Sequence, residues 1–278
     1  MIVVQTERRG ASKTRLDPFT LPARAAAPRR PRLLSYVGRW GRARRWLPAN
    51  ALRVLDLGCA FGYGSAAIAA RGPAGRTVVG VERDPEHIAE GRRRFPWVTI
   101  VDADACALPF PDDCADAVVL LDVLEHLAEP TRALAEAHRV LRPGGVVIVS
   151  VPHLGVLAGL DALNIYRALR RRRRSWPAPE AATESASNTH RHFAADELRH
   201  IMRPWFDVDR VARTGLGLQE LVYLALLLMR TKLGADRAYQ ALLLLHLAVY
   251  VADDLVPLGR LAYHLTVRGQ AVFPGETS

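Results

Sequence analysis

The stretch VLDLGCAFGYGS, residues 54–65, contains a glycine-rich loop that can be read in two frames. The frame DxGxxxG runs from Asp56 to Gly62, and the frame GxGxxA runs from Gly62 to Ala67 and matches a dinucleotide fingerprint. A dinucleotide site needs its first glycine directly after the first strand, because the tight turn must aim a helix N-terminus at the pyrophosphate. The apolar strand ends at Leu57, so the second frame begins too late. The sequence therefore favours the first frame and argues against a nicotinamide cofactor.

Short apolar strands alternate with helices along most of the chain. Strands are expected at Arg53–Leu57, Thr77–Val81, Val98–Val101, Ala117–Leu121, Gly145–Val151, Phe206–Val211 and Ala262–Phe273. Helices are expected at Ser65–Ala70, Pro85–Arg94, Pro130–Val140, Leu160–Arg174 and Ala195–Met202. This spacing predicts right-handed βαβ units. We therefore expect an α/β fold with a doubly wound, mostly parallel, seven-stranded sheet.

Two strongly apolar helices are expected before the last strand, at Leu218–Leu233 and Ala235–Leu255. Their longest uncharged stretches hold nine and twelve residues, whereas a membrane span needs about 20. An apolar helical hairpin over 216–258 is therefore predicted as an insertion in a main domain of residues 32–215 plus 259–275. The hairpin could pack on that domain, cover a lipophilic substrate or lie at a membrane interface.

The basic charge is concentrated near the N-terminus. Residues 1–50 carry a net charge of +10, equal to that of the whole chain, and nearly all basic residues are Arg. Residues 1–31 are rich in Arg, Ala and Pro and predict a disordered basic tail, and a basic amphipathic helix is expected over 33–47. A GC-rich genome would explain the arginines, and so would a surface for anionic lipid or nucleic acid. For the arginine run 170–174, the alternatives are a solvated helix end, binding of an anionic phosphate or lipid headgroup, and contact with an RNA backbone.

Cysteine usage and the N-terminus bear on the compartment. The three cysteines form no CxxC pair and no metal-ligand spacing, and an odd, sparse count fits a reducing environment. No apolar segment of a secretory signal follows the first charges, although an Arg-rich, acid-poor head can imitate a transit peptide. We expect a cytoplasmic protein, with membrane association left open and no metal site.

Further short motifs follow the glycine loop in a regular order. They are VGVERD, DADACALPFPDDCADAVV, LLDVLEHLAEP, HRVLRPGGVVIVSVPH and HRHFAADELRHIMRPWF. Together with the loop, they resemble the class I S-adenosylmethionine-dependent methyltransferases, in the subgroup that includes the ubiquinone and menaquinone methyltransferases. The resemblance covers roughly residues 50–215 and implies a Rossmann-like methyltransferase fold. It fails past Arg213, where the family has a short connection in place of the apolar insertion.

The resemblance implies S-adenosylmethionine as the cofactor and assigns residues to it. Glu82 at the end of strand two would accept both ribose hydroxyls, Asp104 would bind the adenine amino group, and Leu120 would offer a carbonyl near the sulfonium. Ala60 replaces the commoner middle glycine of the loop and is small enough for close approach. The full cofactor-binding set is Asp56, Gly58, Ala60, Gly62, Glu82, Arg83, Asp104, Ala105 and Leu120.

Histidines are the candidates for acid–base chemistry. Methyl transfer to a hydroxyl of high pKa needs a general base. His126 follows strand four and His153 follows strand five, so both are expected at the ligand-bearing edge and are the candidate catalytic residues. His190 and His192 follow the arginine run and could reach over the site, but no third metal ligand accompanies them. A structural role remains open for each histidine.

The sequence thus predicts a methyltransferase that acts on a small, lipophilic or lipid-linked acceptor. Peripheral membrane contact through the Arg-rich regions and the hairpin is a hypothesis. A nucleic-acid methyltransferase is an alternative, disfavoured because aromatic residues are not interleaved with the basic ones. A non-catalytic scaffold is another, against which the intact Asp56, Glu82 and Asp104 argue. The sequence does not predict the oligomeric state.

Overall fold

The computed structural model describes residues 15–22, 38–70, 72–156, 158–172, 191–233, 249, 252–253 and 256–273. The strands are β1 Arg53–Leu57, β2 Thr77–Glu82, β3 Thr99–Asp102, β4 Ala115–Leu121, β5 Leu141–Pro152, β6 Phe206–Thr214 and β7 His264–Ala271. The helices are α1 Gly38–Trp46, α2 Tyr63–Ala69, α3 Pro85–Arg94, α4 Pro130–Val140, α5 Ala162–Arg172, α6 Ala195–Met202 and α7 Leu218–Leu233. Each expected element with described residues is present, with ends shifted by a few residues.

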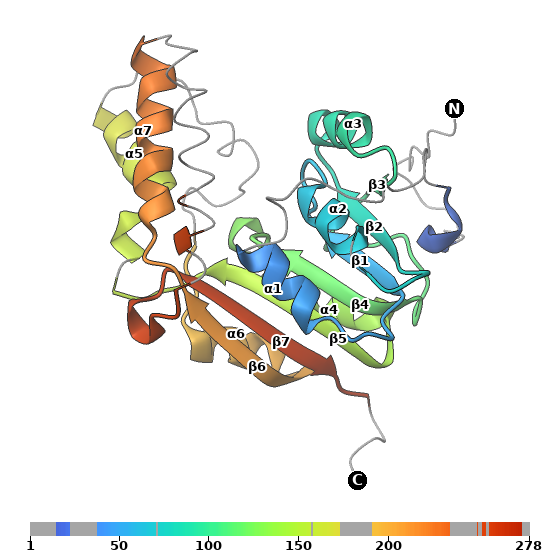
Figure 1. The fold of residues 1–278 in the computed structure, drawn as a ribbon. Coiled ribbons are helices and arrows are strands. Elements are labelled where there is room, and N and C mark those ends of the chain that lie inside the picture. The colour runs from blue at the N-terminus through green and yellow to red at the C-terminus, as the bar shows by residue number, and fades with distance from the viewer. Residues whose placement is uncertain are drawn as a thin grey trace.

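The strands form one seven-stranded sheet in the order β3-β2-β1-β4-β5-β7-β6 (Figure 1). Neighbouring strands from β3 to β5 pair in parallel, whereas β7 pairs antiparallel with both β5 and β6. The expectation of a mostly parallel sheet is confirmed, with β7 as the reversed strand. Because β6 runs parallel to β5, the start of β7 lies at the same edge as the carboxyl ends of the other strands.

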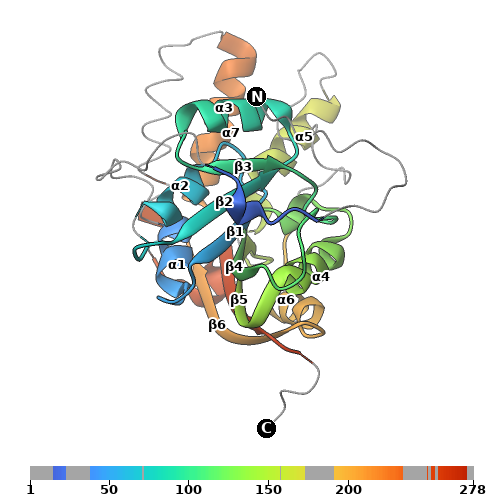
Figure 2. The ribbon, with the colours of Figure 1, turned by 90° about the vertical axis from the view of Figure 1, so that its right-hand side faces the viewer.

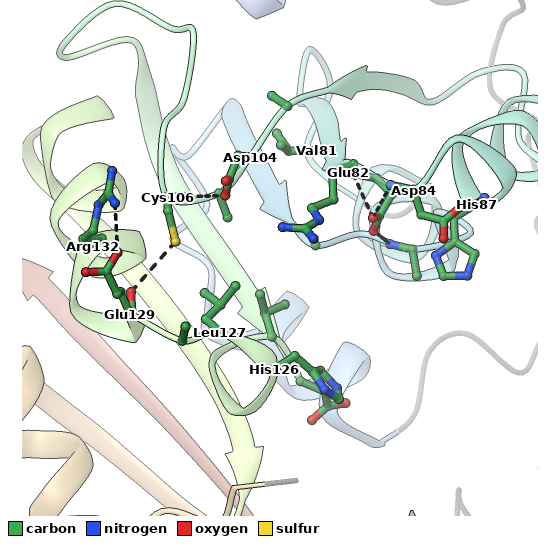
Figure 3. A pocket seen from close by; sticks show the side chains of 18 of the residues that line it. Val81, Glu82, Asp84, His87, Asp104, Cys106, His126, Leu127, Glu129 and Arg132 are labelled. Atoms are coloured by element: carbon green, nitrogen blue, oxygen red, sulfur yellow. Dashed lines mark hydrogen bonds and ion pairs between the residues drawn. The ribbon is translucent and has the colours of Figure 1, made fainter. Parts of the chain in front are cut away.

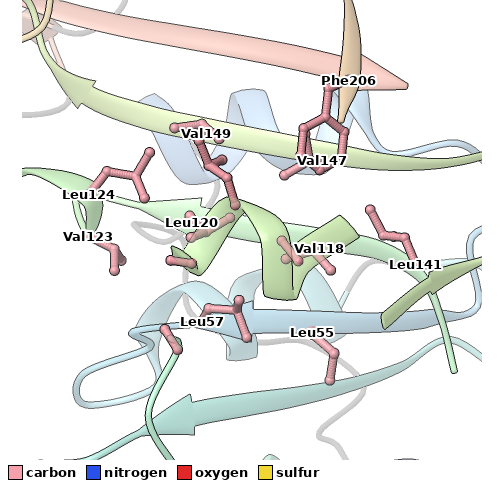
Figure 4. Close-up of a cluster of buried hydrophobic side chains, with 14 of the residues drawn as sticks. Leu55, Leu57, Val118, Leu120, Val123, Leu124, Leu141, Val147, Val149 and Phe206 are labelled. Carbon is pink, nitrogen blue, oxygen red and sulfur yellow. The ribbon is translucent and has the colours of Figure 1, made fainter. Parts of the chain in front are cut away.

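Both faces of the sheet are buried, as near-continuous apolar strands require. Leu55, Leu57, Val118, Leu120 and other alternating residues share one face with α4 and α6 (Figure 4). Their neighbours, including Val54, Val119 and Ile148, pack on the opposite face against α1 and α2. Figure 2 shows α1 and α2 on one side of the sheet and α4 and α6 on the other. Because helices cover both faces of the sheet, the loops at the carboxyl ends of its strands are left to form a binding site.

Residues 15–22 pack on the domain, although the sequence placed them in a disordered tail. The Leu16 amide donates to the Pro109 carbonyl oxygen at 3.1 Å. Pro18 is buried, and Phe19 contacts the core and stacks under the Arg53 guanidinium, 5.4 Å from its ring centre. The segment differs from the prediction because its few apolar residues find partners that composition alone does not reveal. The rest of 1–31 lies outside the described residues.

Helices α5 and α7 pack against each other beyond the carboxyl end of β5 (Figure 1). Helix α7 has the predicted bounds, Leu218–Leu233, while most of the second predicted apolar helix lies outside the described residues. Leu226 is buried, and Leu218 and Leu221 are exposed. In the described part of the chain, no helix combines the length and apolar character needed to cross a bilayer.

Candidate functional site

The glycine loop after β1 has left-handed backbone at both glycines of the frame that runs from Asp56 to Gly62. Gly58 has φ +70° and Gly62 has φ +77°, both in the left-handed region that glycine tolerates. A Cβ on Gly58 would lie 2.6 Å from Val123 Cγ2, so the loop backbone must approach the end of β4 closely. Ala60 occupies φ +45°, a costly conformation for a residue with a Cβ. The loop is therefore held in a strained shape against the neighbouring strand.

Asp56 steadies this loop from inside β1. Its side chain is 3% exposed, and its Oδ2 accepts a hydrogen bond of 2.6 Å from the Ser65 hydroxyl in α2. Burial raises the pKa of Asp56 to about 6, and the nearby Glu82 carboxylate adds to the shift, while the Ser65 hydrogen bond opposes it. The carboxyl group therefore links the strand to the helix on either side of the loop.

Glu82 ends β2 with its carboxylate fixed by three backbone amides. Ala60 N–H donates to Oε2 at 2.8 Å. Arg83 and Asp84 N–H donate to Oε1 at 2.8 and 3.0 Å. The carboxylate thus connects the glycine loop to the turn after β2. A carboxylate offers about four lone-pair positions, so Oε2 keeps one for a further hydroxyl donor.

Asp104 occupies the turn after β3, beside Glu82. The Ala103 amide donates to the Glu82 carbonyl oxygen at 3.0 Å, which joins the two strand ends. Asp104 Oδ1 accepts from the Cys106 amide at 2.8 Å. Burial raises the pKa of the Cys106 thiol, and the Asp104 charge adds to this. The Asp104 carboxylate therefore has a fixed direction set by its own turn.

These groups line a cavity of about 800 Å³ at the carboxyl ends of β1 to β4. Figure 3 shows Glu82 and Asp104 at neighbouring strand ends and His126 on the turn after β4. His126 ends the short 3-10 turn Leu124–His126. The predicted site residues that the structure brings to this cavity are Gly58, Ala60, Glu82, Arg83, Asp104, Ala105 and His126.

The other predicted residues lie outside the cavity wall. Asp56 and Gly62 support the loop from behind it. Leu120 is fully buried within β4, in register with Leu57 of β1. His153 lines a second cavity beyond β5. The structure therefore separates His126 and His153, which the sequence placed at one edge.

Asp122 lines the cavity and was not predicted. It follows β4 with φ +59°, its N–H donates to the Ser150 carbonyl oxygen at 2.8 Å, and its carboxylate forms an ion pair with Arg39 of α1. Arg39 is 6% exposed. The position of Asp122 just past an apolar strand was a usable signal, but its partner on a distant helix was not visible. Asp122 brings a buried positive charge close to the cavity.

A group of buried polar side chains gathers at the far end of the carboxyl edge. Tyr263 donates to Asp161 Oδ2 at 3.3 Å, and His192 Nε2 lies 3.5 Å from the same oxygen. Burial, together with the Glu220 and Asp161 carboxylates, raises the pKa of Tyr263 far above its usual range, so its hydroxyl stays a donor. His190 lies outside the described residues. Across the described ranges, no group of three or more His, Cys, Asp or Glu side chains is arranged to hold a metal ion.

A family model described as "Methyltransferase domain" matches residues 55–149. The chain is 33% identical over 184 residues to a demethylmenaquinone methyltransferase of Renibacterium salmoninarum, covering 62% of this chain and 71% of that protein. It is 35% identical over 153 residues to the Thermus thermophilus protein of the same name, covering 46% and 69%.

A shorter match joins the chain to a Mycolicibacterium smegmatis protein named "Probable S-adenosylmethionine-dependent methyltransferase", 42% identical over 100 residues. That match covers 36% of this chain and only 38% of the relative's length.

Solved structures share the fold at low sequence identity. A SAM-dependent methyltransferase from Thermotoga maritima superimposes with a TM-score of 0.53 at 17% identity, covering 85% of this chain and 89% of that one. A phosphoethanolamine N-methyltransferase 2 from Haemonchus contortus gives 0.52 at 19% identity, covering 84% and 51%.

Proposed function

The chain belongs to the class I S-adenosylmethionine-dependent methyltransferases, and we propose that it transfers the methyl group of S-adenosylmethionine to a small, lipophilic acceptor. The observation that carries the cofactor part is Glu82, held by three amides at the cavity wall with one lone-pair position left at Oε2. That position suits a ribose hydroxyl. Asp104 on the neighbouring strand end would take the adenine amino group.

The loop between β1 and α2 would surround the methionine part of the cofactor. Gly62 precedes α2 without a side-chain cap, so the first amides of the helix remain available to an anionic group. Gly58 lets the backbone approach Val123 closely, which a side chain would prevent. Asp56 and Ser65 hold the two ends of the loop together. The residues present therefore fit the cofactor.

The cofactor supplies an electrophilic methyl carbon, and the protein's part is to position the acceptor and exclude water. We propose that His126 accepts the acceptor's proton, since it is the candidate histidine that lines the cavity. Asp122 lines the same cavity and, paired with the buried Arg39, would orient a polar group of the acceptor.

For the acceptor, we propose a lipophilic quinol, the reduced form of a quinone of the kind that the name demethylmenaquinone methyltransferase gives for the Renibacterium and Thermus relatives. The apolar sequence of the segment 216–258 supports this proposal, in which that segment would cover the acceptor. Its two ends meet beside β6, because Gly215 N–H donates to Val256 O at 3.1 Å and Leu258 N–H to Arg213 O at 3.3 Å. An insertion whose ends meet can be added to a domain without disturbing its sheet. The main domain would then comprise 32–215 plus 259–275.

Calorimetric titration of the full chain with S-adenosylmethionine tests the cofactor part. Glu82→Gln should weaken binding by about 10–100-fold, because a hydrogen bond to a charged group contributes about 1.5–3 kcal/mol. Glu86→Gln is the matched control, since Glu86 is exposed on α3 and does not line the cavity. A folded wild type that does not bind the cofactor would contradict the proposal and favour a scaffold.

The acceptor part needs a separate measurement. Transfer of a labelled methyl group to a short-chain naphthoquinol should occur with the wild type and fall with His126→Ala, while cofactor binding by that variant persists. Cofactor binding without transfer to any naphthoquinol would contradict the quinol assignment and leave the cofactor site standing.

A further inference from the structure

A second cavity, of about 470 Å³, lies at the carboxyl edge on the opposite side of β5 from the cofactor cavity. Its wall comes from the segment after β5, the end of β6, the start of α6 and the turn Gly259–Leu261 before β7. The lining residues are His153, Leu154, Gly155, Val156, Ala195, Asp196, Arg213 and Arg260. None of them lines the cofactor cavity.

Two arginines supply positive charge to this cavity. Arg213 lies near the end of β6 and Arg260 lies in the turn before β7, so segments far apart in sequence bring the two arginines to one wall. Within the described ranges, neither arginine forms an ion pair, whereas Arg139, Arg142 and Arg268 all do. Guanidinium groups bind phosphate and carboxylate oxygens with paired, charge-assisted hydrogen bonds. Their charge is therefore available to an anion.

His153 adds a polar group of fixed orientation. It is 7% exposed, and its Nδ1 lies 3.0 Å from the Ala262 carbonyl oxygen. A carbonyl oxygen only accepts, so Nδ1 carries the hydrogen, and Nε2 is left to accept a hydrogen bond. Among described residues, Nε2 has no hydrogen-bond partner. The side chain is thus locked with one nitrogen unused at the cavity wall.

The start of α6 completes the wall. Its N-cap, Ala194, has no side-chain oxygen to accept from the amides of the first turn. The amides of the first turn and the helix dipole favour an anion at this end. Glu197 of the same turn accepts from the Ala194 amide, and its charge is paired with Arg191. Asp196 also lines the cavity, but its side chain is 94% exposed and lies 3.4 Å from Arg199. Its negative charge is therefore turned towards solvent and another arginine.

The rim of the cavity is apolar and exposed. Leu154 is 57% exposed and Val156 is 73% exposed, and both line the cavity. Gly155 lies between them, where a Cβ would come within 2.9 Å of the Ala262 and Arg260 carbonyl oxygens. The turn therefore lies flat against the loop before β7 and presents its two large apolar side chains outward.

We propose that this second cavity binds a phosphate group, with Arg213 and Arg260 as charged donors and His153 as partner of a phosphate hydroxyl. The apolar rim fits a phosphate that belongs to an amphiphile, although a free phosphorylated metabolite presents the same group. The site is separate from methyl transfer, and its test requires no cofactor.

The test uses the full chain and inorganic phosphate as the probe, followed by calorimetry. The double variant Arg213→Gln/Arg260→Gln should bind phosphate at least about tenfold more weakly, as expected when charge-assisted hydrogen bonds are lost. The control is Arg203→Gln, an exposed arginine after α6 that lines neither cavity. It should bind phosphate like the wild type. Thermal unfolding of each variant checks that all three proteins are folded.

A second arm distinguishes the two sources of phosphate. Flotation with phosphatidic acid vesicles, whose phosphate monoester keeps a hydroxyl, compared with phosphatidylcholine vesicles, should show binding that the double arginine variant loses and Val156→Ser weakens. Phosphate binding lost in the double variant, without vesicle binding, would support the site and identify its ligand as soluble. Phosphate binding that is absent or equal in wild type and double variant would overturn the proposal. Vesicle binding in that case would come from other basic regions.

Discussion

The two ends of the sheet's carboxyl edge are built differently. At the β1 to β4 end, polar groups are satisfied by the backbone close to them: Glu82 accepts from Arg83 and Asp84, and Asp104 accepts from Cys106. At the β5 to β6 end, polar groups join segments that are far apart in sequence, as in the Tyr263–Asp161 hydrogen bond. Apart from the Ala60–Glu82 hydrogen bond and the Asp122–Arg39 ion pair, the contacts named at the first end are therefore local in sequence, whereas those at the second end are tertiary. Changes at the first should act on the cofactor, and changes at the second on how the apolar insertion is attached.

The largest effect is expected from Gly58→Ala at the β1 to β4 end. The left-handed φ of +70° costs about 1–2 kcal/mol for a residue with a Cβ. The clash with Val123 adds the cost of overpacking, about 1–3 kcal/mol. Denaturant unfolding should show both losses, and calorimetry should show cofactor binding reduced by at least about 100-fold, equivalent to roughly 2.7 kcal/mol.

Gly75→Ala separates the effect of backbone strain from the effect of the steric clash. Gly75 has φ +86° with nothing within 4 Å of an added Cβ, so this variant bears the backbone strain without the clash. It should lose about 1–2 kcal/mol of stability and keep cofactor binding. Equal losses of cofactor affinity in the two variants would contradict the role assigned to the close approach at Val123.

Asp56→Asn should change the pH dependence of the unfolding free energy, because the Asp56 carboxyl group is buried behind the loop. Burial raises the pKa of Asp56 to about 6 in the folded chain, whereas an unfolded Asp titrates near 3.9. Between these values the folded state holds a proton that the unfolded state has lost, so this group lowers the stability of the wild type as pH rises. The difference in unfolding free energy, variant minus wild type, should therefore increase between about pH 4 and pH 6, by up to roughly 3 kcal/mol.

Chemical denaturation across that pH range measures the difference. Asp207→Asn, on the exposed side of β6, controls for the loss of one carboxylate. A constant difference between Asp56→Asn and wild type from pH 4 to pH 7 would show that Asp56 is not the titrating group.

The contrast between local and distant contacts explains which features could be predicted from the sequence. All seven strands and the glycine loop were predicted, because period, glycine placement and short βα turns are local features. The family resemblance predicted a cofactor role for Glu82 and Asp104 from residues immediately around strand ends, and both line one cavity. The structure adds the reason that Glu82 is fixed, since the Ala60 amide reaches it across the loop.

The residues that the sequence did not reveal are those whose partners are distant. Asp122 lies two residues after the predicted Leu120. Its ion-pair partner, Arg39, lies on a helix before the first strand. His126 and His153 look equivalent in sequence, because each follows a strand. They nevertheless line two different cavities, which lie on opposite sides of β5. The ordered segment 15–22 depends on Pro109 in the same way. No local pattern specifies such pairs.

Asp122 lies where the two ends meet, and Asp122→Asn should test how firmly they are connected. The change keeps a residue type that tolerates φ +59° and removes the charge that faces the buried Arg39. Weakening a charge-assisted hydrogen bond of a buried arginine costs about 1–3 kcal/mol, and thermal unfolding should show this loss of stability. Asp112→Asn is the comparison, because its pairs with Arg15 and Arg139 are exposed and contribute about 0–1 kcal/mol. Equal losses would mean that Arg39 is as well hydrated as the surface arginines.

The smallest effect is expected from Asp253→Ala at the insertion. The Asp253 carboxylate is 5% exposed and accepts from the amides of Leu216, Gly217 and Leu218, at 2.6, 2.9 and 3.1 Å, at the start of α7. It caps the helix from the returning end of the insertion, so its loss should cost about 1–2 kcal/mol. Because the site at β1 to β4 is built mainly from contacts that are local in sequence, cofactor affinity should stay unchanged, while hydrogen exchange of α7 amides should accelerate. Loss of cofactor affinity in this variant would show that the two ends of the edge are coupled, and the division between them would then fail.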